Sequence, residues 1–124
     1  MNLKALKRWF VIHFITDFAI AIPLFLFPEY FLTFMGWSSV DPLMTRLVAS
    51  ALFGIGGISL IAKNSSKETF KTLLNLKIIW SLSAITALII ALIRSNYPPV
   101  VWLFLIIFIL FSATWIYFRT QIDK

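Results

Sequence analysis

Four long apolar segments constrain this chain most strongly, because each one matches the hydrocarbon thickness of a lipid bilayer. A helix rises about 1.5 Å per residue, so about 20 apolar residues are needed to cross about 30 Å of hydrocarbon. The segments are residues 9–27, 44–62, 73–93 and 100–118. A span in lipid must satisfy its backbone hydrogen bonds internally. The sequence therefore predicts an all-α integral membrane bundle, with residues 1–124 forming a single four-helix transmembrane domain.

The composition agrees with a lipid environment. Of the 124 residues, 60% are hydrophobic and 13% are charged, and the charged residues cluster between the apolar segments. A soluble domain of this size could not bury so much apolar surface. The net charge of +6 comes from basic residues at segment ends and not from a continuous stripe. This distribution indicates contacts with membrane lipids and no nucleic-acid partner.

The first connection contains signals for a short interfacial helix with the sequence PEYFLTFM. Pro28 suits the first turn of this helix, and Gly36 is a candidate left-handed cap at its end. Asp41 followed by Pro42 is typical of an N-cap and the first helical position, so the pair is expected to open the second span.

The other two connections also predict where helices begin. Ser65 and Glu68 have the spacing of a capping box, which places the start of the third helix near Ser66 and projects the helix beyond the membrane. The sequence Asn-Tyr-Pro-Pro at residues 96–99 predicts a tight turn before the fourth helix.

Basic residues predict the orientation in the cell membrane, because cytoplasmic loops are enriched in Lys and Arg. One side of the predicted bundle carries Lys4, Lys7, Arg8, Lys63, Lys67, Lys71, Arg119 and Lys124. The opposite side carries only Arg46 and Arg94. We therefore expect a multi-pass protein with cytoplasmic N and C termini.

A cleaved signal peptide is the alternative reading of the first span. A basic stretch precedes it, and Ala19-Ile20-Ala21 has the spacing of a cleavage site. Asp17 interrupts the apolar region, however, and the apolar run continues past the supposed cut to Phe27. These two features favour a retained span.

Four ionisable residues inside the spans form a candidate intramembrane polar cluster: His13, Asp17, Lys77 and Arg46. Each costs about 2.5 to 3.5 kcal/mol on insertion scales, so each requires a partner or a role. His13 and Asp17 are one helical turn apart, and Lys77 lies at a similar depth, so Asp17 can meet either cation.

For two members of the cluster a structural role is the alternative. Lys77 can extend its ammonium to the headgroups, and Arg46 can anchor the outer end of the second span. The Asp17 side chain is too short to reach either interface. For Asp17 we retain two hypotheses: handling of a proton, ion or ligand, and a structural interhelical hydrogen bond.

Small residues predict where the helices pack. Ser50, Gly54 and Gly57 share a face of the second span with Arg46, and Ser81 shares a face of the third span with Lys77. Because small side chains let helices approach closely, we expect both faces to be helix-packing surfaces, with Gly54 a close-contact position.

Signatures of catalysis and of cofactor binding are absent from the sequence. There is no cysteine, which excludes disulfides and iron–sulfur clusters, and the single histidine excludes a bis-histidine haem within one chain. No HExxH motif, nucleophile elbow or phosphate-binding loop is present. We therefore expect a protein that is not an enzyme, with no catalytic residue, metal or cofactor.

The exit LFLFPE of the first span, the following Gly-Trp and the stretch TRLVASALFGIGG resemble the DoxX-like four-helix membrane proteins. That family includes a subunit associated with thiosulfate:quinone oxidoreductase, and many of its members have no known role. The resemblance implies a fold, and no catalytic residue carries over. The architecture is also similar to the small multidrug-resistance transporters, which use a first-helix glutamate for proton-coupled exchange. Asp17 would be its analogue, although the surrounding residues do not match.

Three functional hypotheses follow. The leading one is a non-enzymatic membrane protein that binds a lipid-soluble ligand or a membrane partner through the intrabundle polar cluster. The first alternative is a proton-coupled small-molecule transporter acting as a homodimer. The second is an accessory subunit of a quinone-linked redox complex, with a quinone or a membrane protein as its partner.

Overall fold

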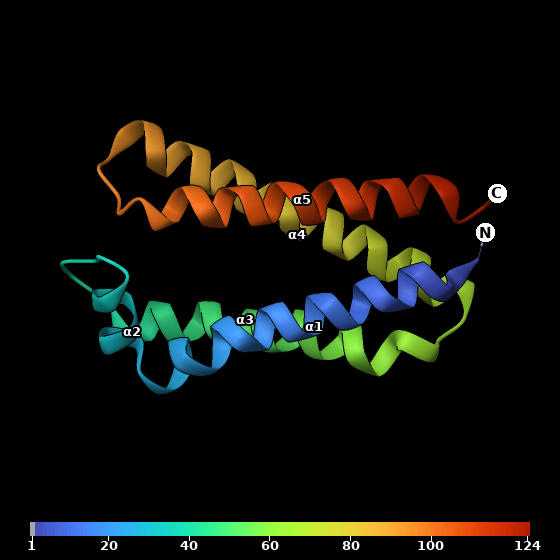
Figure 1. Ribbon diagram of the computed structural model, residues 1–124, viewed down its shortest axis with the longest axis horizontal. Coiled ribbons are helices and arrows are strands. Elements are labelled where there is room, and N and C mark those ends of the chain that lie inside the picture. Colours follow the sequence, from blue (N-terminus) through green and yellow to red (C-terminus); the bar gives the residue numbers. More distant parts are fainter. Residues whose placement is uncertain (1) are drawn as a thin grey trace. The chain divides into compact units, whose positions relative to one another are not determined.

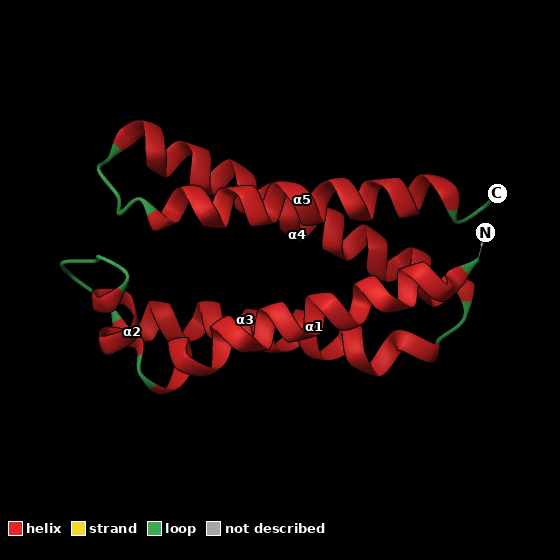
Figure 2. Ribbon diagram, viewed as in Figure 1, coloured by secondary structure: helices red, strands yellow, loops and turns green. Residues whose placement is uncertain are grey.

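The computed structural model describes residues 2–124, and these form only helices and the loops between them (Figure 2). In chain order the elements are α1 (Leu3–Leu26), α2 (Pro28–Phe34), α3 (Pro42–Ile61), the 3-10 helix η1 (Ala62–Asn64), α4 (Lys67–Arg94) and α5 (Val100–Gln121). Within this described range four helices, α1, α3, α4 and α5, are long and apolar enough to cross a membrane. The predictions of an all-helical fold and of four segments long and apolar enough to cross a membrane are confirmed for the described residues.

The described residues divide into two compact units. Residues 2–64 form an N-terminal unit in which α1 packs along α3, and α2 lies between them in the chain (Figure 1). Residues 65–124 form a C-terminal hairpin in which α4 packs against α5.

The end of α2 confirms the cap predicted at Gly36. This glycine has a φ of 112°, a left-handed conformation that costs a glycine little because it has no Cβ. Its N–H donates to the carbonyl of Thr33 at 3.0 Å, and the N–H of Trp37 donates to the carbonyl of Leu32 at 3.0 Å. These two bonds form a Schellman motif, which satisfies carbonyls that the helix end leaves without partners.

The start of α3 confirms the role predicted for Asp41. Its carboxylate accepts from the N–H of Leu43 at 3.0 Å and from the N–H of Met44 at 3.2 Å. Pro42 occupies the first helical position, where its missing N–H is not needed. Asp41 therefore fixes the point at which the chain re-enters a long helix.

The start of α4 corrects one detail of the sequence prediction. The helix begins near Ser66 as expected, but Ser66 itself is the N-cap, and its Oγ accepts from the N–H of Thr69 at 3.3 Å. The capping box proposed for Ser65 and Glu68 is wrong, because a cap at Ser66 moves Glu68 to the second helical position. The predicted turn before α5 is present, and there the N–H of Val101 donates to the carbonyl of Pro98 at 3.0 Å.

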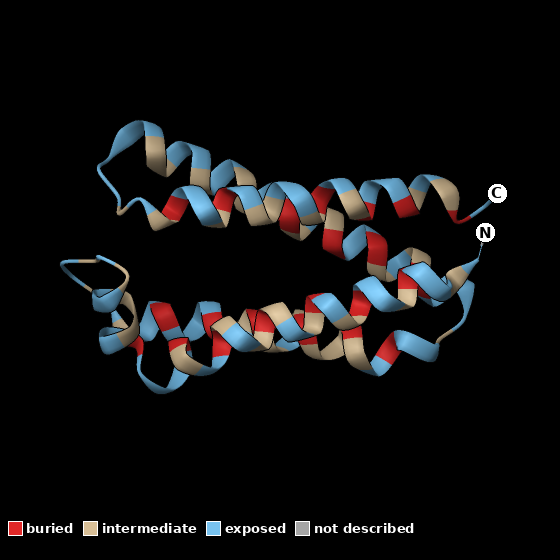
Figure 3. Cartoon of the chain, viewed as in Figure 1, coloured by how far each residue is buried: buried red, intermediate tan, exposed pale blue. Residues whose placement is uncertain are grey.

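Buried residues form narrow stripes along the helices, and most of the remaining surface is exposed and apolar (Figure 3). Examples are Ile15, Ile79 and Leu110, which are 57%, 66% and 63% exposed. So many exposed large apolar side chains are unfavourable in water. A multi-pass membrane protein, whose helices meet lipid over these faces, accounts for it.

Candidate functional site

The N-terminal unit contains a buried acid–base pair within α1. The one-turn spacing of His13 and Asp17 places both side chains on the same face of the helix, as expected. His13 Nε2 lies 3.2 Å from Asp17 Oδ2, and the residues are only 3% and 5% exposed. The Asp17–His13 contact that the spacing allows is thus formed. At this distance a protonated imidazole and the carboxylate would be an ion pair.

A glycine of α3 makes room for the Asp17 side chain. A Cβ built on Gly56 would lie 2.7 Å from the Asp17 Cβ, which is closer than real Cβ atoms approach, and 3.2 Å from its Oδ2, which is a tight contact. Gly57 is less critical, since a Cβ there would meet the Phe18 ring at 3.9 Å. The absence of a side chain at Gly56 therefore allows α3 to cover the carboxylate of α1.

The close contact expected at Gly54 is found at Gly56 instead. A Cβ built on Gly54 meets no atom within 4 Å among the described residues, and this position is exposed. Two residues correspond to about 200° of helical rotation, so Gly54 points away from the α1 seam when Gly56 points into it. Ser50 is also exposed, and its hydroxyl donates to the carbonyl of Arg46 at 2.8 Å within its own helix.

A row of aromatic rings joins α1 and α3 in this unit. The ring of Phe18 lies 4.5 Å from that of Phe14 and 5.0 Å from that of Phe53, measured between centroids. Phe53 in turn lies 5.9 Å from Phe25. These contacts pack the two helices of the unit against each other through edge-to-face aromatic pairs.

Arg46 of α3 contacts α1 near its end and does not join the His13–Asp17 pair. Its Nε donates to the backbone carbonyl of Phe25 at 2.9 Å, and its guanidinium carbon lies 6.0 Å from the centroid of the Phe25 ring. Phe25 is about 12 Å further along α1 than Asp17 at about 1.5 Å per residue. Arg46 thus binds a backbone carbonyl near the end of α1 and ties α3 to that helix. The anchoring role considered from the sequence stays a prediction.

The C-terminal hairpin holds Lys77 in a buried aromatic contact. Its Nζ lies 4.8 Å from the centroid of the Trp115 ring, and the two residues are 1% and 0% exposed. A desolvated cation over an indole face is stabilised by about 2 kcal/mol. Lys77 therefore packs against Trp115 of its own hairpin.

Two serines of this hairpin are also buried. Ser81 is buried one turn after Lys77 and donates to the carbonyl of Ile78 at 3.2 Å. Ser112 is also buried, three residues before Trp115 on α5, and its hydroxyl has no hydrogen-bond partner among the described residues. The sequence did not predict the role of Ser112 or the contact between Trp115 and Lys77. These residues lie on α5 and α4, and spacing within one helix does not show which residues of another helix it contacts.

The fold and these positions define a class: a multi-pass membrane protein with ionisable side chains buried inside its helices. No family model, curated protein or solved structure matches the chain. In the part of the chain that the structure describes, no three His, Asp or Glu side chains gather in a group that could hold a metal ion.

Proposed function

We propose that this chain is a small non-enzymatic integral membrane protein that binds a lipid-soluble ligand through the His13–Asp17 pair. The supporting observation is the burial of two ionisable groups, 3.2 Å apart, in a helix apolar enough to span a membrane. Such groups cost about 2.5 to 3.5 kcal/mol each on insertion scales. Ionisable residues inside spans commonly mark the path of a substrate, ion or proton, which is the role proposed here.

The chemistry of the pair narrows the class of ligand. An imidazole beside a carboxylate offers both a donor and an acceptor in surroundings that are otherwise apolar. A neutral molecule with a carbonyl or hydroxyl group on an apolar body fits this combination, and quinones are the test case. Lys77, held over Trp115 in the C-terminal hairpin, is a second buried ionisable position within a span.

The test is a binding titration of the purified full chain in detergent with decylubiquinone, followed by quenching of tryptophan fluorescence. Asp17→Asn keeps the shape of the side chain but removes its charge, so the variant should keep its melting temperature and bind about tenfold more weakly, a change of about 1.4 kcal/mol. The matched control is Thr16→Val, which removes an adjacent hydroxyl that bonds only to its own helix, at the Ile12 carbonyl, 2.9 Å away. Thr16→Val should bind as the wild type does.

Two outcomes would contradict this function. Unchanged quinone affinity in Asp17→Asn would reduce the pair to a structural role. Absence of saturable binding by the wild type would exclude quinones as the ligand.

Proton-coupled transport is the second candidate, and the buried carboxylate of Asp17 is the observation that favours it. In proteoliposomes, a transporter would accumulate tetraphenylphosphonium in response to a pH gradient, and Asp17→Asn would abolish that uptake. A binding protein would show no gradient-driven uptake. An accessory subunit of a quinone-linked complex would instead copurify with a redox-active membrane protein.

A further inference from the structure

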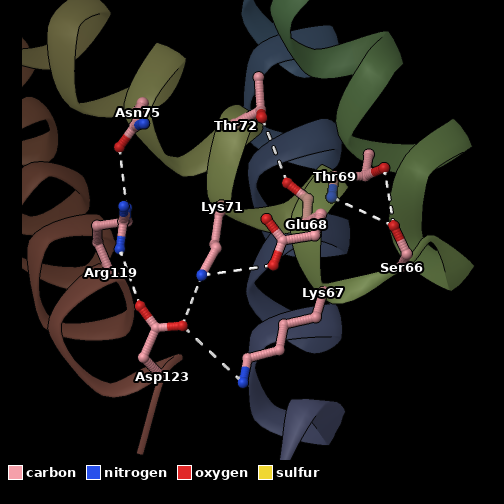
Figure 4. Close-up of polar contacts among 9 residues, drawn as sticks. All are labelled: Ser66, Lys67, Glu68, Thr69, Lys71, Thr72, Asn75, Arg119 and Asp123. Carbon is pink, nitrogen blue, oxygen red and sulfur yellow. Dashed lines mark hydrogen bonds and ion pairs between the residues drawn. The ribbon is translucent and has the colours of Figure 1, made fainter.

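One end of the C-terminal hairpin gathers three cationic side chains around a single carboxylate (Figure 4). Asp123 Oδ1 lies 2.6 Å from Lys71 Nζ and 3.9 Å from Lys67 Nζ. Asp123 Oδ2 lies 3.8 Å from a terminal guanidinium nitrogen of Arg119. The cations come from the start of α4 and the end of α5, so the packing of the hairpin brings them together around this carboxylate.

Further contacts hold two of these cations in place. Arg119 Nε donates to Asn75 Oδ1 at 2.9 Å, and Lys71 Nζ lies 3.4 Å from Glu68 Oε1. The side chains of Lys71 and Arg119 are 22% and 34% exposed, whereas that of Asp123 is 55% exposed. The carboxylate thus lies on the outside of a partly covered cationic surface, where another anion can replace it.

The electrostatics of the cluster favour binding of an anion. The hydrogen bond with Asp123 raises the pKa of Lys71 above its ordinary value, and the same bond lowers the pKa of Asp123. Three cations face two carboxylates, Asp123 and Glu68, so the cluster keeps a positive charge. A group with more negative charge than one carboxylate would neutralise it more fully.

The position of the cluster along the helices suits a headgroup. Lys67 precedes the apolar segment of residues 73–93 by six residues, which is about 9 Å of helix at about 1.5 Å per residue. Arg119 directly follows the apolar segment of residues 100–118. Both helices therefore present these cations where the chain leaves the hydrocarbon, at the depth of lipid phosphates.

We propose that Lys67, Lys71 and Arg119 form a phosphate-binding site in which Asp123 occupies the place that the phosphate takes. The phosphate would belong to the headgroup of an anionic lipid or be a free ion. Binding exchanges one anion for another and displaces the Asp123 side chain from Lys71 and Arg119. The site is separate from the His13–Asp17 pair, so each proposal can fail without the other.

The test measures binding of short-chain phosphatidic acid to the purified full chain in neutral detergent by native mass spectrometry. Lys71→Gln should weaken binding about fivefold, as expected for the loss of one partly exposed charge contact. Asp123→Asn should strengthen binding about fivefold, because the competing carboxylate is removed. The matched control is Arg94→Gln at the other end of α4, which has the same charge change and should leave binding within about twofold of the wild type.

Parallel titrations with inorganic phosphate and with short-chain phosphatidylcholine identify the source of the group. Binding of phosphatidic acid alone, with the expected response to Lys71→Gln, assigns the site to an anionic headgroup. An equal response to inorganic phosphate, with the same dependence on Lys71, assigns it to a free ion. Equal losses in Lys71→Gln and Arg94→Gln, unchanged binding in Asp123→Asn, or equal binding of phosphatidylcholine would each overturn the proposal. The Asp123→Asn result decides the matter if Lys71→Gln does not fold.

Discussion

Gly56 of α3 lies directly against Asp17 of α1, so close that a Cβ on the glycine would be 2.7 Å from the Asp17 Cβ. At that distance the atoms overlap, and either the aspartate or one of the helices would have to move. The burial of the carboxylate and the close approach of the two helices therefore depend on the same missing side chain. A residue one carbon larger than glycine would disturb both.

We predict that Gly56→Ala lowers the stability of the detergent-solubilised protein by about 1 to 3 kcal/mol, the usual cost of overpacking. Gly54→Ala is the matched control, because a Cβ there meets no atom within 4 Å. It should be neutral or stabilise by up to about 1 kcal/mol through the higher helix propensity of alanine. Thermal unfolding followed by circular dichroism measures both. Equal melting temperatures would show that the seam does not require glycine at position 56.

The difference between these two glycines shows where sequence reasoning ends. The buried face of α3 contains Ala49, Leu52, Gly56 and Ser59, and the face predicted from the sequence contains Ser50, Gly54 and Gly57. Both sets have helical spacing and small residues. In a soluble helix polarity would separate the inner face from the outer one, but a span in lipid is apolar on both sides. Hydropathy alone therefore predicts the helix without its orientation about its own axis.

Local features were predicted well because their partners are close in sequence. The His13–Asp17 contact follows from a one-turn spacing, and the cap at Asp41 from its position before a proline. The contacts of Lys77 with Trp115 and of Arg46 with Phe25 join different helices. Such pairs depend on how the helices pack against each other, and the residue pattern of a single sequence does not reveal that packing.

A second prediction concerns Arg46. Replacing it with glutamine removes the bond to the Phe25 carbonyl and the contact with its ring, which together contribute about 1 to 2 kcal/mol. Arg46→Lys should recover little, since an ammonium does not reproduce the direction of the Nε–H donor. Arg94→Gln is the control at an exposed position. A melting temperature for Arg46→Gln that matches the control would mean that the cap contributes nothing measurable.

A third prediction concerns pH and the Asp123–Lys71 pair. Bonding to Lys71 lowers the pKa of Asp123 in the folded protein. The stabilisation that the Asp123 carboxylate contributes is therefore complete above about pH 4, which is the pKa of an aspartate in the unfolded chain. It is lost as the pH falls through the lower pKa of Asp123 in the folded protein. Because the pKa of Lys71 is raised, its stabilisation is complete below about pH 10 and is lost as the pH rises through the folded pKa. The stability difference between the wild type and Asp123→Asn should thus be constant between these limits.

Thermal unfolding across this range, at low salt and at 1 M NaCl, provides the measurement. At low salt the difference should shrink below about pH 4, and at 1 M NaCl it should shrink at every pH because salt screens exposed charges. A difference that stays the same at acidic pH would show that the ion pair is not its origin.

A fourth prediction concerns topology. Reporter fusions after Ser65 and after Lys124 should both signal from the cytoplasm, because basic residues concentrate near these positions. A fusion at Tyr97, in the loop between α4 and α5, should signal from the opposite side. A non-cytoplasmic signal at Ser65 or Lys124 would reverse or break the predicted arrangement of the spans.

The most direct test of ligand binding at the His13–Asp17 pair is to identify what the protein carries when it is purified from membranes. Organic extracts of the wild type, Asp17→Asn and Thr16→Val can be compared by mass spectrometry at equal protein amounts. We predict that a lipid-soluble compound with a carbonyl or hydroxyl group is enriched in the extracts of the wild type and Thr16→Val and depleted in that of Asp17→Asn. Identical extracts from all three proteins would contradict binding at this pair.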